Sequence, residues 1–176
     1  MARVTAMSLR AIPIATLAFL MVACGTSSAK EPPVPESALS WWDLVNKVGS
    51  KIPLTAEKVH EATGIVLSAE DSITWTSGPS KLADDVNIIR GELRIGSDGW
   101  SKYSYYAIDL GGRCISLDEV KTHFPDVDVT AGPTGHSRDE KTIYTSVQSW
   151  GITHLGFREK NPNCMTDITI RSEPIR

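Results

Sequence analysis

The sequence has no excess of charge of either sign. Its 18 Lys and Arg residues nearly balance 21 Asp and Glu residues, for a formal charge of −3. Domains that bind nucleic acid are normally strongly basic, so no nucleic-acid partner is expected. Hydrophobic residues make up 41% of the 176 positions and charged residues 22%, which is typical of a folded domain. The length favours one domain or two very small ones.

Common catalytic signatures are also missing. The sequence contains no GxxxxGK[ST], GxGxxG, HExxH or GxSxG motif, which are the patterns that carry much nucleotide, metal and acyl-transfer chemistry. The neighbours Ser137, His136 and Asp139 lie too close in sequence to form a catalytic triad. The pairs Asp84-Asp85 and Asp126-Asp128 are interpreted as solvated loop residues. We therefore expect no catalytic residue, no metal and no cofactor, and predict that the protein is not an enzyme.

No apolar run is long enough to cross a bilayer as a helix, which takes about 20 residues. The longest run, residues 11–22, is interrupted by Pro13 and Thr16 and follows the basic residues Arg3 and Arg10. A short apolar run behind positive charge is typical of a secretory signal.

The end of this run has a more specific pattern. Met21-Val22-Ala23-Cys24 resembles the lipobox of bacterial lipoproteins, although Met21 stands where Leu is usual. The resemblance implies that residues 1–23 are removed and that Cys24 is acylated. Gly25 then implies sorting to the outer membrane, facing the periplasm, with the lipid as the only contact with the membrane.

The residues after Cys24 predict the domain organisation. Residues 24–38 are small, polar and proline-bearing, which is typical of a semi-rigid tether. Residues 39–176 are predicted to form a single compact domain. Removal of the signal takes away Arg3 and Arg10, so 16 basic and 21 acidic side chains remain and the charge becomes −5.

The sequence is poor in cysteine, with three in all. Lipidation of Cys24 leaves Cys114 and Cys164, and an even remainder in an oxidising compartment favours one disulfide. A metal pair or a catalytic thiol would need a CxxC motif or histidines at a matching spacing, which are absent.

Hydrophobic patterning predicts an α+β fold with short helices packed on an antiparallel sheet. We expect helices over 40–48, over 56–63 between the cap Thr55 and Gly64, and from the capping box at Ser116 to about Phe124. The predicted strands cover residues 73–76, 86–95, 100–110, 142–150, 151–158 and 165–171. Two similar helix-plus-sheet units, 53–110 and 114–171, are a further hypothesis.

The turn Gly96-Ser-Asp-Gly99 predicts a hairpin in which Ile95 pairs with Trp100, Glu92 with Tyr103 and Arg90 with Tyr105. One face would then belong to the core, with Ile89, Leu93, Ile95, Trp100, Tyr106 and Ile108. The opposite, solvated face would carry Arg90, Glu92, Arg94, Ser101, Tyr103 and Tyr105. A slip of one residue would exchange the two faces.

The candidate partner-binding residues come from that solvated face and from one loop. Tyr, Trp and Arg dominate the energetic hot spots of protein interfaces, which favours Arg90, Glu92, Arg94, Tyr103 and Tyr105. The loop 131–140 adds His136 and Arg138, because loops often carry function. The alternatives are an ordinary exposed sheet face held by cross-strand pairs and an ordinary hairpin connection.

The order of helix and antiparallel strands over 53–171, with a cysteine just before the second helix, resembles β-lactamase-inhibitor-protein-like and BamE-like envelope proteins. The single expected disulfide departs from the inhibitor pattern of one per repeat. Immunity lipoproteins share the lipobox, tether and compact acidic body. The resemblance implies a non-enzymatic protein that neutralises a toxin or hydrolase encoded nearby. The alternative is a structural or assembly lipoprotein of the envelope.

Overall fold

The computed structural model describes residues 34–96 and 103–172. Cys24 and the predicted signal lie outside these ranges. The described helices are α1 (Trp41–Gly49), α2 (Ala56–Thr63) and α3 (Leu117–His123).

Each helix begins at a hydroxyl cap. The side chains of Ser40, Thr55 and Ser116 accept hydrogen bonds from backbone N–H groups three residues further on. Such bonds satisfy donors that the first helical turn leaves unpaired. At the other end, α2 stops at Gly64, which has a φ of 75°. The three predicted helices are thus confirmed, with ends within about one residue of the expected positions.

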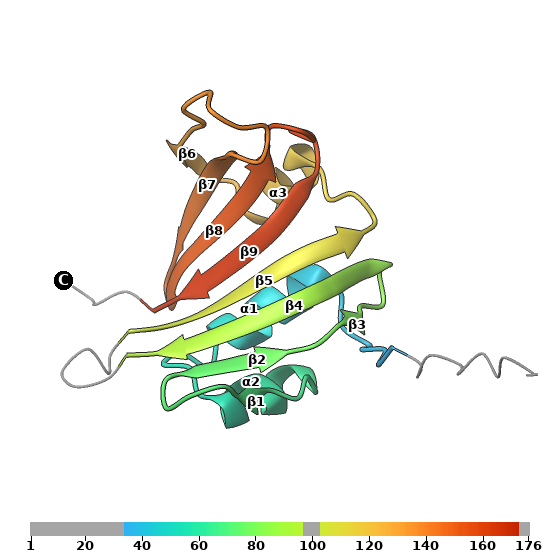
Figure 1. Ribbon diagram of the computed structural model, residues 1–176, viewed down its shortest axis with the longest axis vertical. Helices are drawn as coiled ribbons and strands as arrows, with labels where there is room; N and C mark the ends of the chain where they lie inside the picture. Colours follow the sequence, from blue (N-terminus) through green and yellow to red (C-terminus); the bar gives the residue numbers. More distant parts are fainter. Residues whose placement is uncertain (1–33, 97–102, 173–176) are drawn as a thin grey trace, which may run out of the picture. The chain divides into compact units, whose positions relative to one another are not determined.

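Nine strands in the described residues form one sheet (Figure 1). They are β1 (Ser68–Ala69), β2 (Thr74–Ser77), β3 (Ser80–Lys81), β4 (Val86–Ile95), β5 (Ser104–Gly112), β6 (Asp128–Ala131), β7 (Lys141–Gln148), β8 (Gly151–Arg158) and β9 (Met165–Arg171). The order is β1-β2-β4-β5-β9-β8-β7-β6, with β3 beside β4, and the pairs between these strands are antiparallel. The predicted α+β class is therefore confirmed.

The sheet consists of two meanders that meet in its centre. Strands β1 to β5 follow α2, strands β6 to β9 follow α3, and the last strand of each group, β5 and β9, pair with each other. This is the order of a helix followed by strands that was predicted for 53–110 and 114–171. That the two units are similar to each other stays a prediction.

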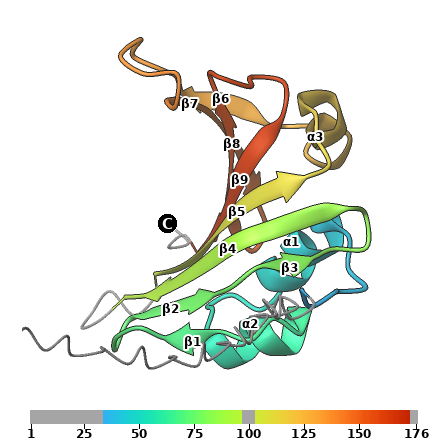
Figure 2. The same cartoon turned by 45° about the vertical axis from the view of Figure 1, so that its right-hand side comes forward.

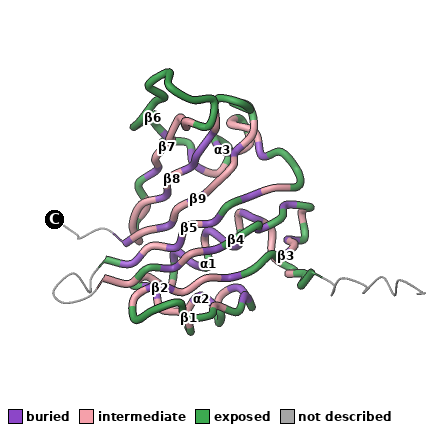
Figure 3. Tube along the Cα trace, in the orientation of Figure 1, coloured by how far each residue is buried: buried purple, intermediate pink, exposed green. Residues whose placement is uncertain are grey.

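All three helices pack on the same face of the sheet (Figures 2 and 3). Leu93, Tyr106 and Ile168 on that face are at most 1% exposed and share one hydrophobic core with Val45 of α1 and Val120 of α3. The one-sided cover explains the alternation along the strands, because every second residue enters this core and its neighbours point away from it.

Two details of the predicted hairpin are wrong. Ile89 is 56% exposed rather than in the core, because a bulge between Ile88 and Arg90 turns it outward and leaves Ile88 to fill the core position. The pairing is also shifted, so that Arg94 lies opposite Tyr105 and Glu92 opposite Ala107. The shift is by an even number of residues, so the assignment of Glu92 and Tyr105 to the outer face survives.

Other strand predictions hold to different extents. The bounds of β4, β8 and β9 are those predicted. Strand β6 was not predicted, and the interpretation of Asp128 as a loop residue is wrong: it begins this exposed edge strand and pairs with Thr145. Ser101 and Trp100 lie outside the described residues.

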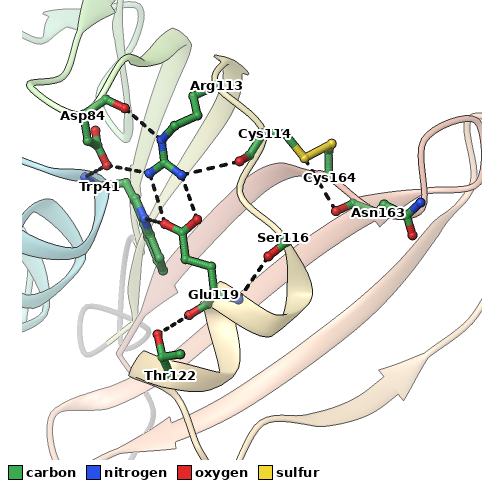
Figure 4. A network of polar contacts seen from close by, with 9 residues as sticks. All are labelled: Trp41, Asp84, Arg113, Cys114, Ser116, Glu119, Thr122, Asn163 and Cys164. Carbon is green, nitrogen blue, oxygen red and sulfur yellow. Dashed lines mark hydrogen bonds and ion pairs between the residues drawn. A yellow bond between two sulfur atoms is a disulfide. The ribbon is translucent and has the colours of Figure 1, made fainter.

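Arg113 joins two of the helices and the end of β5 (Figure 4). Its guanidinium donates two hydrogen bonds to Glu119 of α3, at 2.7 and 3.0 Å, and one to the Asp84 carboxylate at 3.1 Å. Glu119 in turn accepts a 2.8 Å hydrogen bond from the Trp41 indole of α1. The hydrogen bonds from Arg113 lower the pKa of the Glu119 carboxyl.

We expect Arg113→Met to lower the free energy of unfolding by about 2 kcal/mol, the scale of hydrogen bonds to charged groups that leave unpaired partners when removed. Urea denaturation of the full chain measures this. The control Arg90→Met makes the same charge change but removes exposed ion pairs to Glu70 and Glu92, so it should cost less than about 1 kcal/mol. Equal losses would contradict a special role for Arg113.

The predicted disulfide between Cys114 and Cys164 is present, with Cα atoms 5.1 Å apart and a sequence separation of 50. It ties the segment before α3 to the start of β9. Here the backbone N–H of Met165 also donates to the Ile115 carbonyl at 2.9 Å.

Replacing both cysteines, as Cys114→Ala with Cys164→Ala, should lower the free energy of unfolding by about 4 kcal/mol, because a cross-link over such a loop restricts the unfolded chain. Thermal melts of the oxidised, reduced and doubly substituted chains test this. A reduced chain that melts with the oxidised one would contradict it.

Candidate functional site

The face of the sheet turned away from α1, α2 and α3, here called the open face, is the candidate site. Figure 2 shows the strands bending so that the described helices lie on the outside of the bend. On β4, β5 and β9 the outward positions include Arg90, Glu92, Tyr105, Asp109 and Asp167. These charged and aromatic side chains point to a surface for polar recognition.

A cleft of about 230 Å³ lies on the open face. Ala107 of β5 and Thr169 of β9 are directly opposite each other in the ladder and form a floor of small side chains. Longer side chains surround them: the cleft is lined by Arg90, Glu92, Tyr105, Ala107, Ile108, Asp109, Lys141, Asp167 and Thr169. The hollow therefore follows from the small residues in the middle of the sheet.

The cations around the cleft already have ion-pair partners. Arg90 lies 3.4 Å from Glu92 and 3.8 Å from Glu70, and Arg94 lies 2.8 Å from Glu92. Lys141 of β7 reaches across to Asp167 of β9 at 2.8 Å. These pairs order the rim of the cleft more than they stabilise the fold, because exposed pairs contribute little.

Asp109 differs from these residues. It is exposed on β5, and no ion pair or hydrogen bond joins its carboxylate to another described side chain. It lies opposite Asp167 in the β5–β9 ladder and opposite Arg90 in the β4–β5 ladder, so one like charge and one opposite charge occupy the directly opposed positions. Gly156 of β8 leaves room for the Asp167 carboxylate, which a Cβ at that position would contact.

A polar chain crosses the open face beside the cleft. The hydroxyl of Thr130 on β6 lies 2.6 Å from that of Thr145 on β7, which lies 2.8 Å from Nδ1 of His154 on β8. Partial burial lowers the pKa of His154 below its ordinary value of 6.5, and the charge of Arg171 lowers it further.

The structure brings together four of the seven residues predicted to bind a partner. Arg90, Glu92, Arg94 and Tyr105 share the open face on the adjacent strands β4 and β5. Tyr103 precedes β5 and is 37% exposed.

His136 and Arg138 lie elsewhere, in the loop that leads into β7. That loop is built around Glu140, whose carboxylate accepts hydrogen bonds from the backbone N–H groups of Thr134, Gly135 and His136. The loop ends at Lys141, which lines the same cleft as Arg90, Glu92 and Tyr105, whereas His136 and Arg138 do not line it.

Sequence reasoning missed Asp109, Lys141, Asp167 and Thr169. The alternation along 165–171 places Asp167 and Thr169 on the side opposite to Ile168 and Ile170, so this signal was present. The pairing of β9 with β5, which brings Asp167 to Asp109, joins positions 58 residues apart and has no local signal.

The other histidines have structural contacts. His123 stacks on Trp42 with ring centroids 4.3 Å apart, and its ring meets that of Trp41 edge-on. Nδ1 of His60 lies 3.2 Å from the Ile65 carbonyl. Within residues 34–96 and 103–172, no three His, Cys, Asp or Glu side chains are arranged to hold a metal ion.

A second, mostly apolar cavity of about 290 Å³ lies beside residues 35–37, at the end of the predicted tether. This segment runs along β3, where Ser37 N–H donates to the Lys81 carbonyl at 2.7 Å and Lys81 N–H donates to Pro35 at 2.8 Å. None of the helices in the described part of the chain is long and apolar enough to cross a membrane.

No protein-family model, curated protein or solved structure matches this chain.

We expect the free energy of unfolding to decrease as the pH is lowered from 7.5 to 5.5, because His154 binds a proton more weakly in the folded chain than in the unfolded chain. His154→Gln does not titrate and should flatten this decrease. Urea denaturation at both pH values measures it. The carboxyl groups of Asp139 and Glu140 have lowered pKa values, so their effect on the free energy of unfolding falls at more acidic pH. If His154→Gln kept the same pH dependence, the decrease in the free energy of unfolding could not be assigned to His154.

Proposed function

We propose that the chain is a non-enzymatic lipoprotein, acylated at Cys24 and facing the periplasm, that binds and neutralises a protein partner through the open face. The partner would be a toxin or hydrolase encoded nearby. The lipobox-like Met21-Val22-Ala23-Cys24 supports the lipid anchor. The disulfide between Cys114 and Cys164 suits an oxidising compartment.

The observation that carries the binding role is the open face itself. A sheet with helices on one side normally presents an ordinary polar surface on the other side. Here that surface has a cleft with a floor of small residues and a rim of charged side chains and Tyr105. Arg and Tyr are enriched in the hot spots of protein interfaces, and rim charges steer a complementary partner.

The first experiment immobilises the full chain in detergent and offers it two probes: the purified product of the adjacent gene, and an envelope extract from the same cells. Nanomolar binding of the neighbouring product, with loss of its toxic or hydrolytic activity, supports the proposal. Binding of resident envelope proteins alone overturns neutralisation in favour of an assembly role. Binding of neither overturns the proposal.

Ala107→Trp should weaken that capture about thirtyfold or more, the scale of a hot-spot loss, because the indole fills the floor of the cleft. Surface plasmon resonance measures the affinity, and a thermal melt checks the fold. The control Lys121→Trp adds the same side chain to an exposed position on α3, on the helix side, and should bind normally. Full affinity in a folded Ala107→Trp chain would exclude the cleft as the place where the partner binds.

A further inference from the structure

We infer that the second cavity binds a short aliphatic molecule that carries one uncharged hydrogen-bonding oxygen, such as an alcohol. The hydroxyl of Ser80 would bind that oxygen, and the apolar walls of the cavity would cover the aliphatic part. The cavity is separate from the open face, so this inference does not rest on the proposed function.

The cavity lies where three segments of the chain meet. It is lined by residues 35–37 at the end of the predicted tether, residues 63–66 at the end of α2, and residues 77–80 between β2 and β3. Its volume of about 290 Å³ is about twice that of an apolar cavity known to hold benzene, so it suits a ligand of about ten non-hydrogen atoms.

One wall of the cavity contains a hydroxyl without a partner. Ser80 lies directly opposite Ile88 in the β3–β4 ladder, and opposed side chains point to the same side of a sheet. The Ser80 side chain is therefore on the helix side, with the core. It is 7% exposed, and its Oγ has no hydrogen-bond partner within the described residues. Because an unpaired buried hydroxyl is costly, this atom favours a ligand that supplies the missing hydrogen bond.

A second hydroxyl that lines the cavity is only weakly bonded. Oγ of Ser77 lies 3.5 Å from the Tyr106 hydroxyl, whereas an ordinary O–H···O bond is about 2.8 Å long. Gly91 makes room for these two hydroxyls, since a Cβ at that position would collide with both oxygens. Ser77 therefore keeps hydrogen-bonding capacity for a ligand in the same cavity.

The charges around the cavity favour an uncharged ligand. Among the described residues that line it, Glu36 is the only charged one, and the neighbouring Lys81 is already paired with Asp85 at 3.0 Å. A carboxylate would thus bury its charge without a cation, which is costly. An ammonium paired with the exposed Glu36 would stay in water, away from the buried Ser80.

The apolar part of the ligand would contact Ile65, Val66, Pro35 and Pro79, which line the same cavity. Ile65 is 7% exposed and belongs to the core, whereas Val66 is 70% exposed. An aliphatic chain over these residues would remove apolar surface from water, both its own and that of Val66, and this burial would supply most of the affinity.

The test titrates 1-hexanol into the ¹⁵N-labelled full chain and follows the backbone amide shifts. We expect saturable shifts at Ile65, Val66, Gly78 and Ser80, with a dissociation constant in the millimolar range, because so small a ligand buries little surface. Hexanoate and hexylamine, which are charged, and ethanol, which lacks the chain, should give no saturable shifts there at the same concentrations.

Ser80→Ala should weaken hexanol binding about fivefold, the scale of one hydrogen bond. A thermal melt should show no loss of stability, because the hydroxyl that is removed has no partner within the described residues. The control Ser72→Ala makes the same change at an exposed position before β2 and should bind hexanol as the unmodified chain does.

Val66→Ser tests the apolar wall and should weaken hexanol binding about threefold, because less apolar surface is covered. Val66 is exposed, so the fold should tolerate the change. The control Val129→Ser makes the same substitution at an exposed position on β6 and should leave the affinity unchanged.

The inference is overturned if hexanoate or hexylamine binds as tightly as hexanol, if ethanol gives equal shifts, or if the hexanol shifts do not saturate. A Ser80→Ala chain that binds hexanol with full affinity would mean that this hydroxyl bonds only to water, and it would overturn the inference too. Equal losses in Val66→Ser and Val129→Ser would show that hexanol acts on the surface in general and not in the cavity.

Discussion

The hydrogen bonds of Arg113 are the contact on which the arrangement of the helices depends. One guanidinium at the end of β5 binds Glu119 of α3 and Asp84 before β4, and Glu119 also accepts from Trp41 of α1. Helices that belong to different meanders are thereby fixed on one face of a common sheet. The nearby disulfide between Cys114 and Cys164 acts in the same region, by joining the segment before α3 to β9. Both contacts link α1, α3 and β9 on the helix side of the sheet and leave the open face without a covering helix among the described residues.

The features that sequence analysis predicted are those encoded locally. Hydroxyl caps at Thr55 and Ser116 and the stop at Gly64 fix helix ends, because each depends on residues within one turn. The bounds of β4, β8 and β9 were predicted correctly from the alternation of polar and apolar residues. The outer placement of Glu92 and Tyr105 was correct even though their pairing was not, because faces repeat every two residues.

The features that were missed depend on contacts between distant residues. The bulge that exposes Ile89 is a property of how β4 pairs with β5, and no residue type in the segment required it. The meeting of Asp109 with Asp167 and of Asp167 with Lys141 depends on the strand order of the whole sheet. The candidate site was therefore half predictable: the residues of one hairpin were found, and their partners on β7 and β9 were not.

The small residues at the floor of the cleft have a consequence for how recognition can evolve. Ala107 and Thr169 fill no part of the hydrophobic core, which lies on the other face of the sheet with Tyr106 and Ile168. Replacing them changes the depth of the cleft without opening a void among the packed side chains. Substitutions at these two positions can therefore reshape the open face while the packing that stabilises the fold stays unchanged.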